Sequence, residues 1–268
     1  EAFLKEHPQV TGVMVGEGEE TFLELCESYA KAGIGEMAEK MNLSGIKGIM
    51  YRAGESLVKT GAREPLDLNR IPFCYGGVED FRNRIIYYES SRGCPFRCSY
   101  CLSSVEKTLR FRDVERVKKE LAFFLEQEVA QVKFVDRTFN CRHEHAMGIW
   151  KFLIEHDNGV TNFHFEISAD LLTDEEIALI GQMRPGLIQL EIGVQSTNGA
   201  TITEIHRTMQ LDRLKAVVRS IQEKENIHEH LDLIAGLPYE GYETFARSFD
   251  EIYALKPNQL QLGFLKVL

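Results

Sequence analysis

From about residue 80 to its end, the chain alternates short β-rich runs with stretches of helical periodicity, and this pattern limits the possible folds most. The runs that read as strands are residues 85–90, 132–136, 162–168, 187–195, 230–236 and 259–265. Between them, apolar residues recur at helical spacing, as Val117, Leu121 and Phe124 do. Strands joined by helix-length connections pair in parallel. The pattern therefore predicts successive βα units around a parallel sheet.

Several of these strands carry apolar and polar residues in strict alternation. In one of them, Phe163 and Phe165 alternate with His164 and Glu166. A closed barrel fills its interior with branched hydrophobic side chains, whereas these strands have one polar face. If the apolar face packs against the helices, the polar side chains line an open, hydrated lumen with room for substrate and cofactor. A half-exposed antiparallel sheet is the alternative, and the helix-length connections argue against it.

The first 75 residues follow a different pattern. Residues 10–31 read as a strand, a glycine turn and a helix, and residues 45–75 read as a hairpin followed by an extended linker. This is too little for a complete α/β domain, so we expect the end of one. We also expect a piece of a longer protein, because the chain starts without methionine and ends on an apolar strand. The predicted domains are a remnant at 1–75 and an α/β barrel of the partial (β/α)6 TIM-like kind at 76–268.

Composition and charge narrow the functional classes. The chain has 268 residues, of which 44% are hydrophobic, and no apolar run approaches the roughly 20 residues that span a bilayer. It shows no signal peptide, so we expect a cytoplasmic protein with no membrane partner. Its 31 basic and 41 acidic residues give a formal charge of −10, which disfavours a protein that binds mainly by neutralising phosphates. Nucleic acid is therefore not an expected partner.

Three cysteines crowd into one loop directly after the first predicted strand, as Cys94, Cys98 and Cys101. The other cysteines are Cys26, Cys74 and Cys141. In a reducing compartment such a cluster indicates metal binding or redox chemistry rather than disulfides. Structural zinc takes four protein ligands, usually from repeated CxxC pairs, and no second pair occurs here. Three thiolates on a 4Fe-4S cluster would instead leave one iron open to bind and cleave a ligand.

These residues resemble the hallmark of the radical S-adenosylmethionine (SAM) enzymes, which is CxxxCxΦC with an aromatic Φ after the first strand of a partial six-stranded barrel. Here the pattern stands as Cys94, Cys98, Tyr100 and Cys101, and the resemblance extends over residues 80–268. It implies that the cysteines hold a 4Fe-4S cluster whose open iron chelates SAM. An electron then cleaves SAM to methionine and a 5'-deoxyadenosyl radical. The resemblance also implies that Tyr100 lies near the adenine.

Further residues around SAM are implied by resemblance to the coproporphyrinogen-oxidase-like branch of this family. Gln195, in the sequence GVQS, and Arg207 resemble a pair that contacts the methionine carboxylate end. Glu166 and Asp232 occupy positions where that branch has ribose and methionine contacts. Gly236 lies in DLIAGLP, which resembles its fifth-strand adenine-contact segment.

Two segments resemble cobalamin-associated members of the family. The second strand ends in VDRTFN rather than Gly-Gly-Glu, and DRTF resembles their DDTF variant, which implies Asp136 and Thr138 at the methionine amino group. Residues 15–25 resemble the closing segment of the Rossmann-like cobalamin-binding domain that precedes many such enzymes. The Asp-x-His-x-x-Gly loop of that domain is absent here, so cobalamin is expected of the full-length protein and not of this fragment.

The leading interpretation is an enzyme that cleaves SAM reductively and acts on an unknown substrate in the lumen, with a reductant such as flavodoxin or ferredoxin. An iron-sulfur electron carrier is one alternative, although it would more often bring a fourth cysteine. A tRNA methylthiotransferase-like modifier is another, but such enzymes usually carry a basic RNA-binding module. Cys141 is expected to be a buried small residue rather than a thiol hydrogen donor.

Two His-Glu-His stretches, at residues 143–145 and 228–230, invite a metal-binding interpretation. Side chains at i and i+2 do not share a helix face. We therefore expect all four histidines to be solvated residues of helices and loops.

Overall fold

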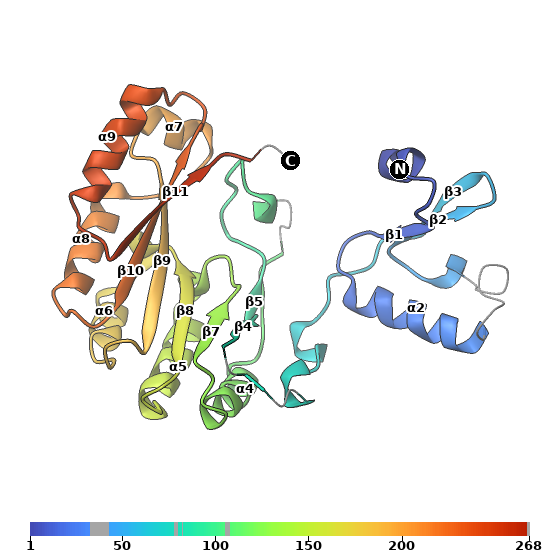
Figure 1. Cartoon of the computed structure of the whole chain (residues 1–268), viewed down its shortest axis with the longest axis horizontal. Helices are drawn as coiled ribbons and strands as arrows, with labels where there is room; N and C mark the ends of the chain where they lie inside the picture. Colours follow the sequence, from blue (N-terminus) through green and yellow to red (C-terminus); the bar gives the residue numbers. More distant parts are fainter. Residues whose placement is uncertain (33–42, 78–79, 82, 105–107, 267–268) are drawn as a thin grey trace. The chain divides into compact units, whose positions relative to one another are not determined.

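The computed structural model describes residues 1–32, 43–77, 80–81, 83–104 and 108–266. The chain divides into two compact units, Glu1–Ile71 and Pro72–Leu268, each of which is described by itself (Figure 1). The sequence placed this boundary at residues 75 and 76, a few residues later.

The first unit combines a small antiparallel sheet with one long helix. Its elements are α1 (Ala2–Glu6), β1 (Gly12–Met14), α2 (Glu19–Ala32), β2 (Ile49–Ala53) and β3 (Ser56–Lys59), with short 3-10 helices at Leu43–Gly45 and Leu68–Arg70. The strands lie in the order β1-β2-β3, with both pairings antiparallel. The predicted strand, helix and hairpin are therefore confirmed. Arg63 fastens the segment after β3 to α2, with Nη1 3.2 Å from Glu20 Oε2 and Nη2 2.7 Å from Glu24 Oε2.

The second unit is built on a six-stranded sheet. Its strands are β4 (Ile85–Tyr88), β7 (Gln131–Phe134), β8 (Asn162–Ile167), β9 (Ile188–Gln195), β10 (His228–Ala235) and β11 (Gln259–Phe264). They lie in chain order from β4 to β11, and every pairing is parallel. The predicted α/β fold with a parallel sheet is thus confirmed, with strand ends within two residues of their expected positions. A two-stranded ribbon, β5 (Ser91–Arg92) and β6 (Arg110–Phe111), flanks the cysteine loop.

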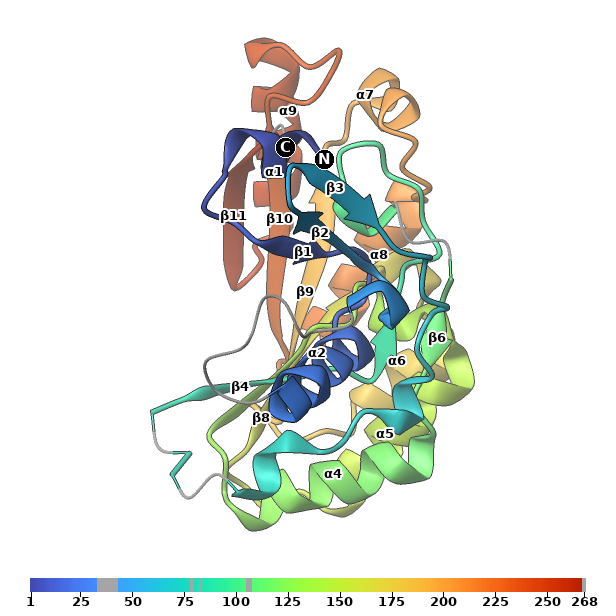
Figure 2. The same ribbon diagram turned by 90° about the vertical axis from the view of Figure 1, so that its right-hand side faces the viewer.

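The connecting helices pack on the apolar face of this sheet (Figures 1 and 2). They are α4 (Val114–Glu126), α5 (His143–Glu155), α6 (Asp174–Ile180), α7 (Gly199–Glu204), α8 (Leu211–Gln222) and α9 (Tyr242–Tyr253), with 3-10 helices at Cys74–Gly77, Leu102–Ser104, Phe139–Cys141 and Ala169–Leu171. The alternation seen in the sequence explains the core, because Ile188, Leu190 and Ile192 of β9 are all buried among the residues that the helices cover. The polar residues between them consequently point to the opposite, inner face.

The expectation of solvated histidines was wrong for two of the four. His145 and His230 are buried, whereas His143 is half-buried and His228 is exposed. His145 lies four residues before Ile149 and so shares the apolar face of α5. His230 lies in β10, and in a strand the side chains at i and i+2 do share a face, unlike in a helix.

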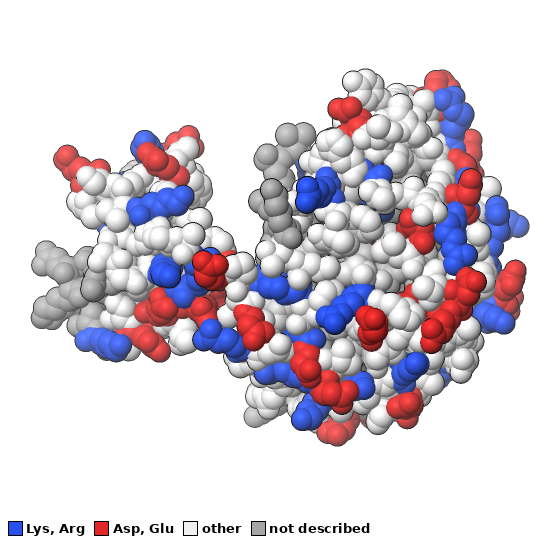
Figure 3. Space-filling view, turned by 180° about the vertical axis from the view of Figure 1, so that it is seen from behind, with Lys and Arg blue, Asp and Glu red and all other residues white. Residues whose placement is uncertain are grey.

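Charged groups of both signs are interspersed on the face of the second unit seen in Figure 3. No helix within the described ranges is long and apolar enough to cross a bilayer.

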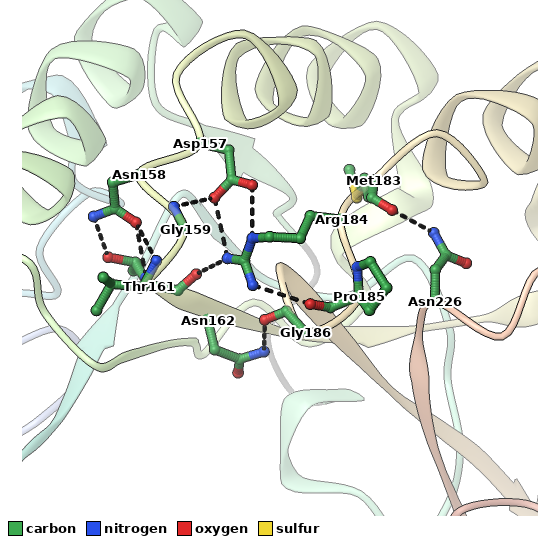
Figure 4. A network of polar contacts seen from close by, with 11 residues as sticks. Asp157, Asn158, Gly159, Thr161, Asn162, Met183, Arg184, Pro185, Gly186 and Asn226 are labelled. Carbon is green, nitrogen blue, oxygen red and sulfur yellow. Dashed lines mark hydrogen bonds and ion pairs between the residues drawn. The ribbon is translucent and has the colours of Figure 1, made fainter.

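A polar network ties together the loops that precede β8, β9 and β10 (Figure 4). The Arg184 guanidinium donates to both oxygens of Asp157, from Nε to Oδ2 at 2.8 Å and from Nη2 to Oδ1 at 3.0 Å. In the next loop, Asn226 Nδ2 donates to the carbonyl oxygens of Ile180 and Met183, each at 2.9 Å. Because these loops are fastened to one another, the amino ends of the three strands are held in register.

Candidate cofactor and active site

A solvent-open cavity lies between the cysteine loop and the inner face of the sheet, and the empty space there, open solvent included, is about 730 Å³. The residues that line it are Cys94, Phe96, Cys98, Tyr100, Cys101, Arg137, Thr138, Glu166, Ile167, Ser168, Glu191, Gly193, Gln195, Arg207 and Asp232. Most of them come from the cysteine loop and the carboxyl-terminal parts of β8, β9 and β10. Parallel α/β folds have their active and ligand-binding sites at this end of the strands. The cavity thus brings together all three loop cysteines and six of the eight other residues singled out in the sequence.

The cysteine loop itself has a constrained start. Gly93 has a φ of +98°, and a Cβ on it would lie 2.5 Å from the carbonyl oxygen of Thr108. Only glycine fits both conditions, which explains its place directly before Cys94. Farther along the loop, Ser99 N donates to the carbonyl oxygen of Ile205 at 2.9 Å, so the loop is also attached to the end of α7.

The loop cysteines differ in exposure and do not converge on one point. Cys98 is buried, and burial raises the pKa of its thiol, whereas Cys94 and Cys101 are half-buried. Among the described residues, no three Cys, His, Asp or Glu side chains are grouped closely enough to hold a single metal ion. A cluster that binds each thiolate through a separate iron does not need such convergence.

Arg207 reaches from the segment after α7 to the cysteine loop and to β9. Its Nη1 lies 3.4 Å from the Tyr100 hydroxyl and 3.9 Å from Cys98 Sγ, and its Nη2 donates to the Gly193 carbonyl oxygen. Its Nε is buried and finds no hydrogen-bond partner among the described residues. A guanidinium held in this way has donors left for an anionic ligand.

Gln195 ends β9 beside Arg207 in an unusual backbone conformation. Its φ is +73°, a region that residues other than glycine rarely adopt and that occurs preferentially at functional sites. Its Oε1 is buried without a hydrogen-bond partner among the described residues. A Cβ on Gly193 would collide with Gln195 Nε2, so the glycine makes room for this side chain. An unpaired buried polar group costs about 1–3 kcal/mol, so the orphan atoms of Gln195 and Arg207 indicate a polar ligand.

On the inner face of β9, Glu191 is at the centre of a cluster of charged side chains. Its Oε2 lies 2.9 Å from Lys133 Nζ and 2.8 Å from His164 Nε2. The close approach of His164, aided by Lys133, lowers the pKa of Glu191 to about 2. Glu166 is 3.9 Å from Lys133, and burial together with the charge of Glu191 raises its pKa. Lys133 is therefore the shared cationic partner of Glu191 and Glu166.

Asp232 adds a third carboxylate to this wall of the cavity. Its Oδ1 is 3.1 Å from His230 Nε2. Burial, followed by the charges of Glu191 and Glu166, raises the pKa of Asp232 to about 7, while burial lowers that of His230. Asp232 can therefore gain or lose a proton near neutral pH. Lys133 and His230 were not predicted as site residues, and His164 was predicted only to face the lumen, although the inner-face positions of all three in their strands were the available signal.

Two of the predicted site residues do not line the cavity. Asp136 is fully buried, and its carboxylate accepts hydrogen bonds from Ser90 and Ser91, while burial raises its pKa to about 6. Gly236 follows β10 with a φ of +91° and also lies outside the lining. Thr138, which was predicted beside Asp136, does reach the cavity, where its Oγ1 lies 3.6 Å from Cys94 Sγ.

The Radical SAM superfamily matches residues 88–252, which is more than half of the chain. This protein belongs to the radical SAM superfamily. The resemblance carried by the cysteine loop is thereby confirmed. Membership implies a 4Fe-4S cluster and SAM as cofactors, and the thiolate triad and orphan polar atoms of the cavity fit both.

Relatives within this superfamily cover the chain almost completely. It is 25% identical over 257 residues to the anaerobic magnesium-protoporphyrin IX monomethyl ester cyclase of Rubrivivax gelatinosus, which covers 92% of this chain and 45% of that protein. It is 27% identical over 265 residues to the cobalamin-dependent radical SAM methyltransferase TokK of Streptomyces tokunonensis, covering 91% of this chain and 37% of that one. The chain therefore spans less than half the length of these two relatives.

A solved structure shows the same fold. The radical SAM methyltransferase TsrM from Kitasatospora setae, determined with cobalamin and a 4Fe-4S cluster bound, superimposes with a TM-score of 0.77 at 17% identity. The match covers 98% of this chain and 54% of TsrM. The likeness supports the partial-barrel description of the six-stranded sheet.

Proposed function

We propose that this chain is the catalytic part of a radical SAM enzyme in which Cys94, Cys98 and Cys101 bind a 4Fe-4S cluster. One observation supports this most strongly: the cysteines share a single cavity with buried polar atoms of Gln195 and Arg207 that have no partner in the described part of the chain. A closed electron carrier has no use for a ligand cavity beside its thiolates. A bound cluster would supply the electron that cleaves SAM to methionine and a 5'-deoxyadenosyl radical.

Several residues around the cavity then have a role in holding SAM. The guanidinium of Arg207 and the amide of Gln195 bind the methionine carboxylate, because Arg donors match carboxylate geometry. The Tyr100 ring packs near the adenine, with its hydroxyl fixed by Arg207. Glu166 accepts hydrogen bonds from the ribose hydroxyls, and Asp232 faces the positively charged end of the ligand. Thr138 stands beside the first cysteine.

The full-length protein is proposed to be cobalamin-dependent and to act on a substrate held against the polar inner face of the sheet. The names of TokK and of the TsrM structure, and the resemblance of residues 15–25 to the end of a cobalamin-binding domain, support this. We further propose a cytoplasmic location and an electron donor such as flavodoxin or ferredoxin. The net charge of −10 and the mixed charges in Figure 3 favour a small-molecule substrate over RNA.

The test is anaerobic reconstitution of the chain with iron and sulfide, followed by dithionite reduction and electron paramagnetic resonance (EPR) before and after addition of SAM. We expect a cluster spectrum that changes with SAM, and formation of 5'-deoxyadenosine detected by chromatography. Cys94→Ser should abolish both signals. Cys74→Ser, at an exposed cysteine outside the cavity, is the matched control and should leave both unchanged.

Two outcomes would contradict the proposal. If the chain takes up only zinc, the thiolates form a structural metal site. If a 4Fe-4S cluster forms but its spectrum ignores SAM, the cavity is not a SAM site and the chain is an electron carrier.

A further inference from the structure

A second polar network lies against the cysteine loop, and its members are absent from the cavity lining. It joins Asp136, which follows β7, to Ser90 and Ser91 just before the loop and to His145 in α5. All four side chains are buried, with at most 2% of their surface exposed. Burying a carboxylate is costly unless hydrogen bonds satisfy it, and Asp136 has several such bonds.

Both carboxylate oxygens of Asp136 accept hydrogen bonds from the two serines. Oδ2 accepts from Ser90 N at 2.9 Å, and Oδ1 accepts from Ser90 Oγ at 2.7 Å and from Ser91 Oγ at 2.5 Å. The single hydroxyl proton of Ser90 is thus directed at Asp136. His145 Nε2, 2.9 Å from Ser90 Oγ, must therefore be the donor in that contact, which assigns the tautomer of the buried imidazole.

These bonds fix the backbone immediately before the first cysteine. The Ser90 carbonyl oxygen accepts from Arg112 N at 2.8 Å, so the segment is held from the β6 side as well. Gly93 then turns the chain tightly past Thr108, which leaves little freedom between the anchored serines and Cys94. Two residues beyond Asp136, the hydroxyl of Thr138 contacts the Cys94 sulfur at 3.6 Å.

We propose that Asp136 is a positioning residue that holds Ser90 and Ser91 and so sets the place of the Cys94 sulfur against Thr138. The inference rests on the proposed function, because it takes Cys94 as a cluster ligand. It replaces the direct contact with the SAM amino group that the sequence suggested for Asp136. It also gives Thr138 a separate role, since a hydroxyl close to a ligating sulfur tunes the potential of the cluster.

The experiment compares Asp136→Asn with Asp157→Asn in the reconstituted chain. Asp157 also accepts paired hydrogen bonds, from Arg184, but at the opposite end of the strands, so its variant controls for general loss of stability. Urea midpoints of both variants are measured alongside the rate at which a chelator removes iron. Loss of a group that bonds directly to a metal ligand costs roughly tenfold or more in metal affinity. Asp136 acts on Cys94 only through Ser90 and Ser91, so we expect D136N to lose iron severalfold faster than D157N.

Two milder variants keep the test decisive if D136N fails to fold. Ser91→Ala removes a single donor to Asp136 and should also speed iron loss, by a smaller factor. Thr138→Val should load iron fully but shift the midpoint potential and the EPR spectrum of the reduced cluster. A structural role alone would change neither the potential nor the spectrum.

Other results would overturn the inference. Equal rates of iron loss in D136N, D157N and the unaltered chain would show that the network does not position Cys94. Normal iron retention by D136N together with lost SAM binding would restore the direct contact expected from the sequence. If the unaltered chain itself forms no 4Fe-4S cluster, the proposed function has failed, and this result is distinct from the other two.

Discussion

Glu229 predicts how the free energy of unfolding of the second unit changes with pH. This β10 residue is fully buried on the helix side, and both of its carboxylate oxygens lack a hydrogen-bond partner among the described residues. The Gln222 amide lies near enough to offset a part of the burial but is not aligned for a hydrogen bond. Burial raises the pKa of Glu229 from 4.5 to about 8, so the carboxyl group is neutral in the folded chain at pH 7.

Because the pKa of Glu229 is raised in the folded chain, its contribution to stability depends on pH. The unfolded chain ionises Glu229 from about pH 4 upward, whereas the folded chain keeps it protonated until about pH 8. The contribution of Glu229 to stability is therefore intact at low pH and declines as the pH rises through this window. The full decline corresponds to about 5 kcal/mol, of which about 3–4 kcal/mol falls between pH 5 and pH 8.

Glu229→Gln removes the titration. We expect the free energy of unfolding of the variant, relative to the unaltered chain, to rise by about 3–4 kcal/mol from pH 5 to pH 8. The amide of the introduced glutamine also lacks hydrogen-bond partners, but the free-energy cost of burying it does not vary with pH. Glu223→Gln, at an exposed position just after α8, should show no such trend.

Urea unfolding followed by tryptophan fluorescence is a suitable assay. Trp150 is the single tryptophan of the chain, and it is fully buried in α5, so its emission reports on the second unit alone. A difference between E229Q and the unaltered chain that stays constant from pH 5 to pH 8 would refute the reasoning. It would mean that water or a local rearrangement solvates the carboxylate.

Three further predictions concern the cavity and its support. Arg207→Lys should weaken SAM binding to the reconstituted chain about tenfold, because an ammonium cannot reproduce the guanidinium fork, and calorimetry measures the loss. Asp232 has a pKa of about 7, so the affinity for cationic SAM should rise severalfold from pH 6 to pH 8, and Asp232→Asn should flatten this profile. Arg184→Ala should cost about 1–3 kcal/mol in urea unfolding, because Asp157 loses both bonds from the guanidinium and keeps only the one from Gly159 N, while iron loading stays normal.

The sequence predicted the architecture because the alternation of strands and helices and the one-sided polarity of the strands are both local patterns. It also predicted nine of the residues that line the cavity: the motif gave the three cysteines, and the resemblance to the radical SAM enzymes implied the other six. Asp136 lay beyond such reasoning. It falls two residues after β7 ends, where the chain no longer alternates, and its direction depends on Ser90 and Ser91, which are far away in sequence.

The histidines show a different limit. His230 opens the predicted strand 230–236, so the spacing rule for helices does not describe it, and its alternation with Asp232 places both on one face of the sheet. The carboxylate group around Glu191 combines side chains from β7, β8 and β9. No single segment reveals such a group, because it depends on the register between neighbouring strands.

The network of Arg184, Asp157 and Asn226 gives the two ends of the sheet unequal tolerance to change. At the amino ends of the strands, paired hydrogen bonds anchor the loops, and substitutions there threaten folding. At the other end, Gln195 and Arg207 carry buried polar atoms that line the cavity and have no partner among the described residues. Substitutions at this rim can alter which molecule is bound while the anchored end preserves the fold. This separation would let one scaffold diversify its chemistry over evolutionary time.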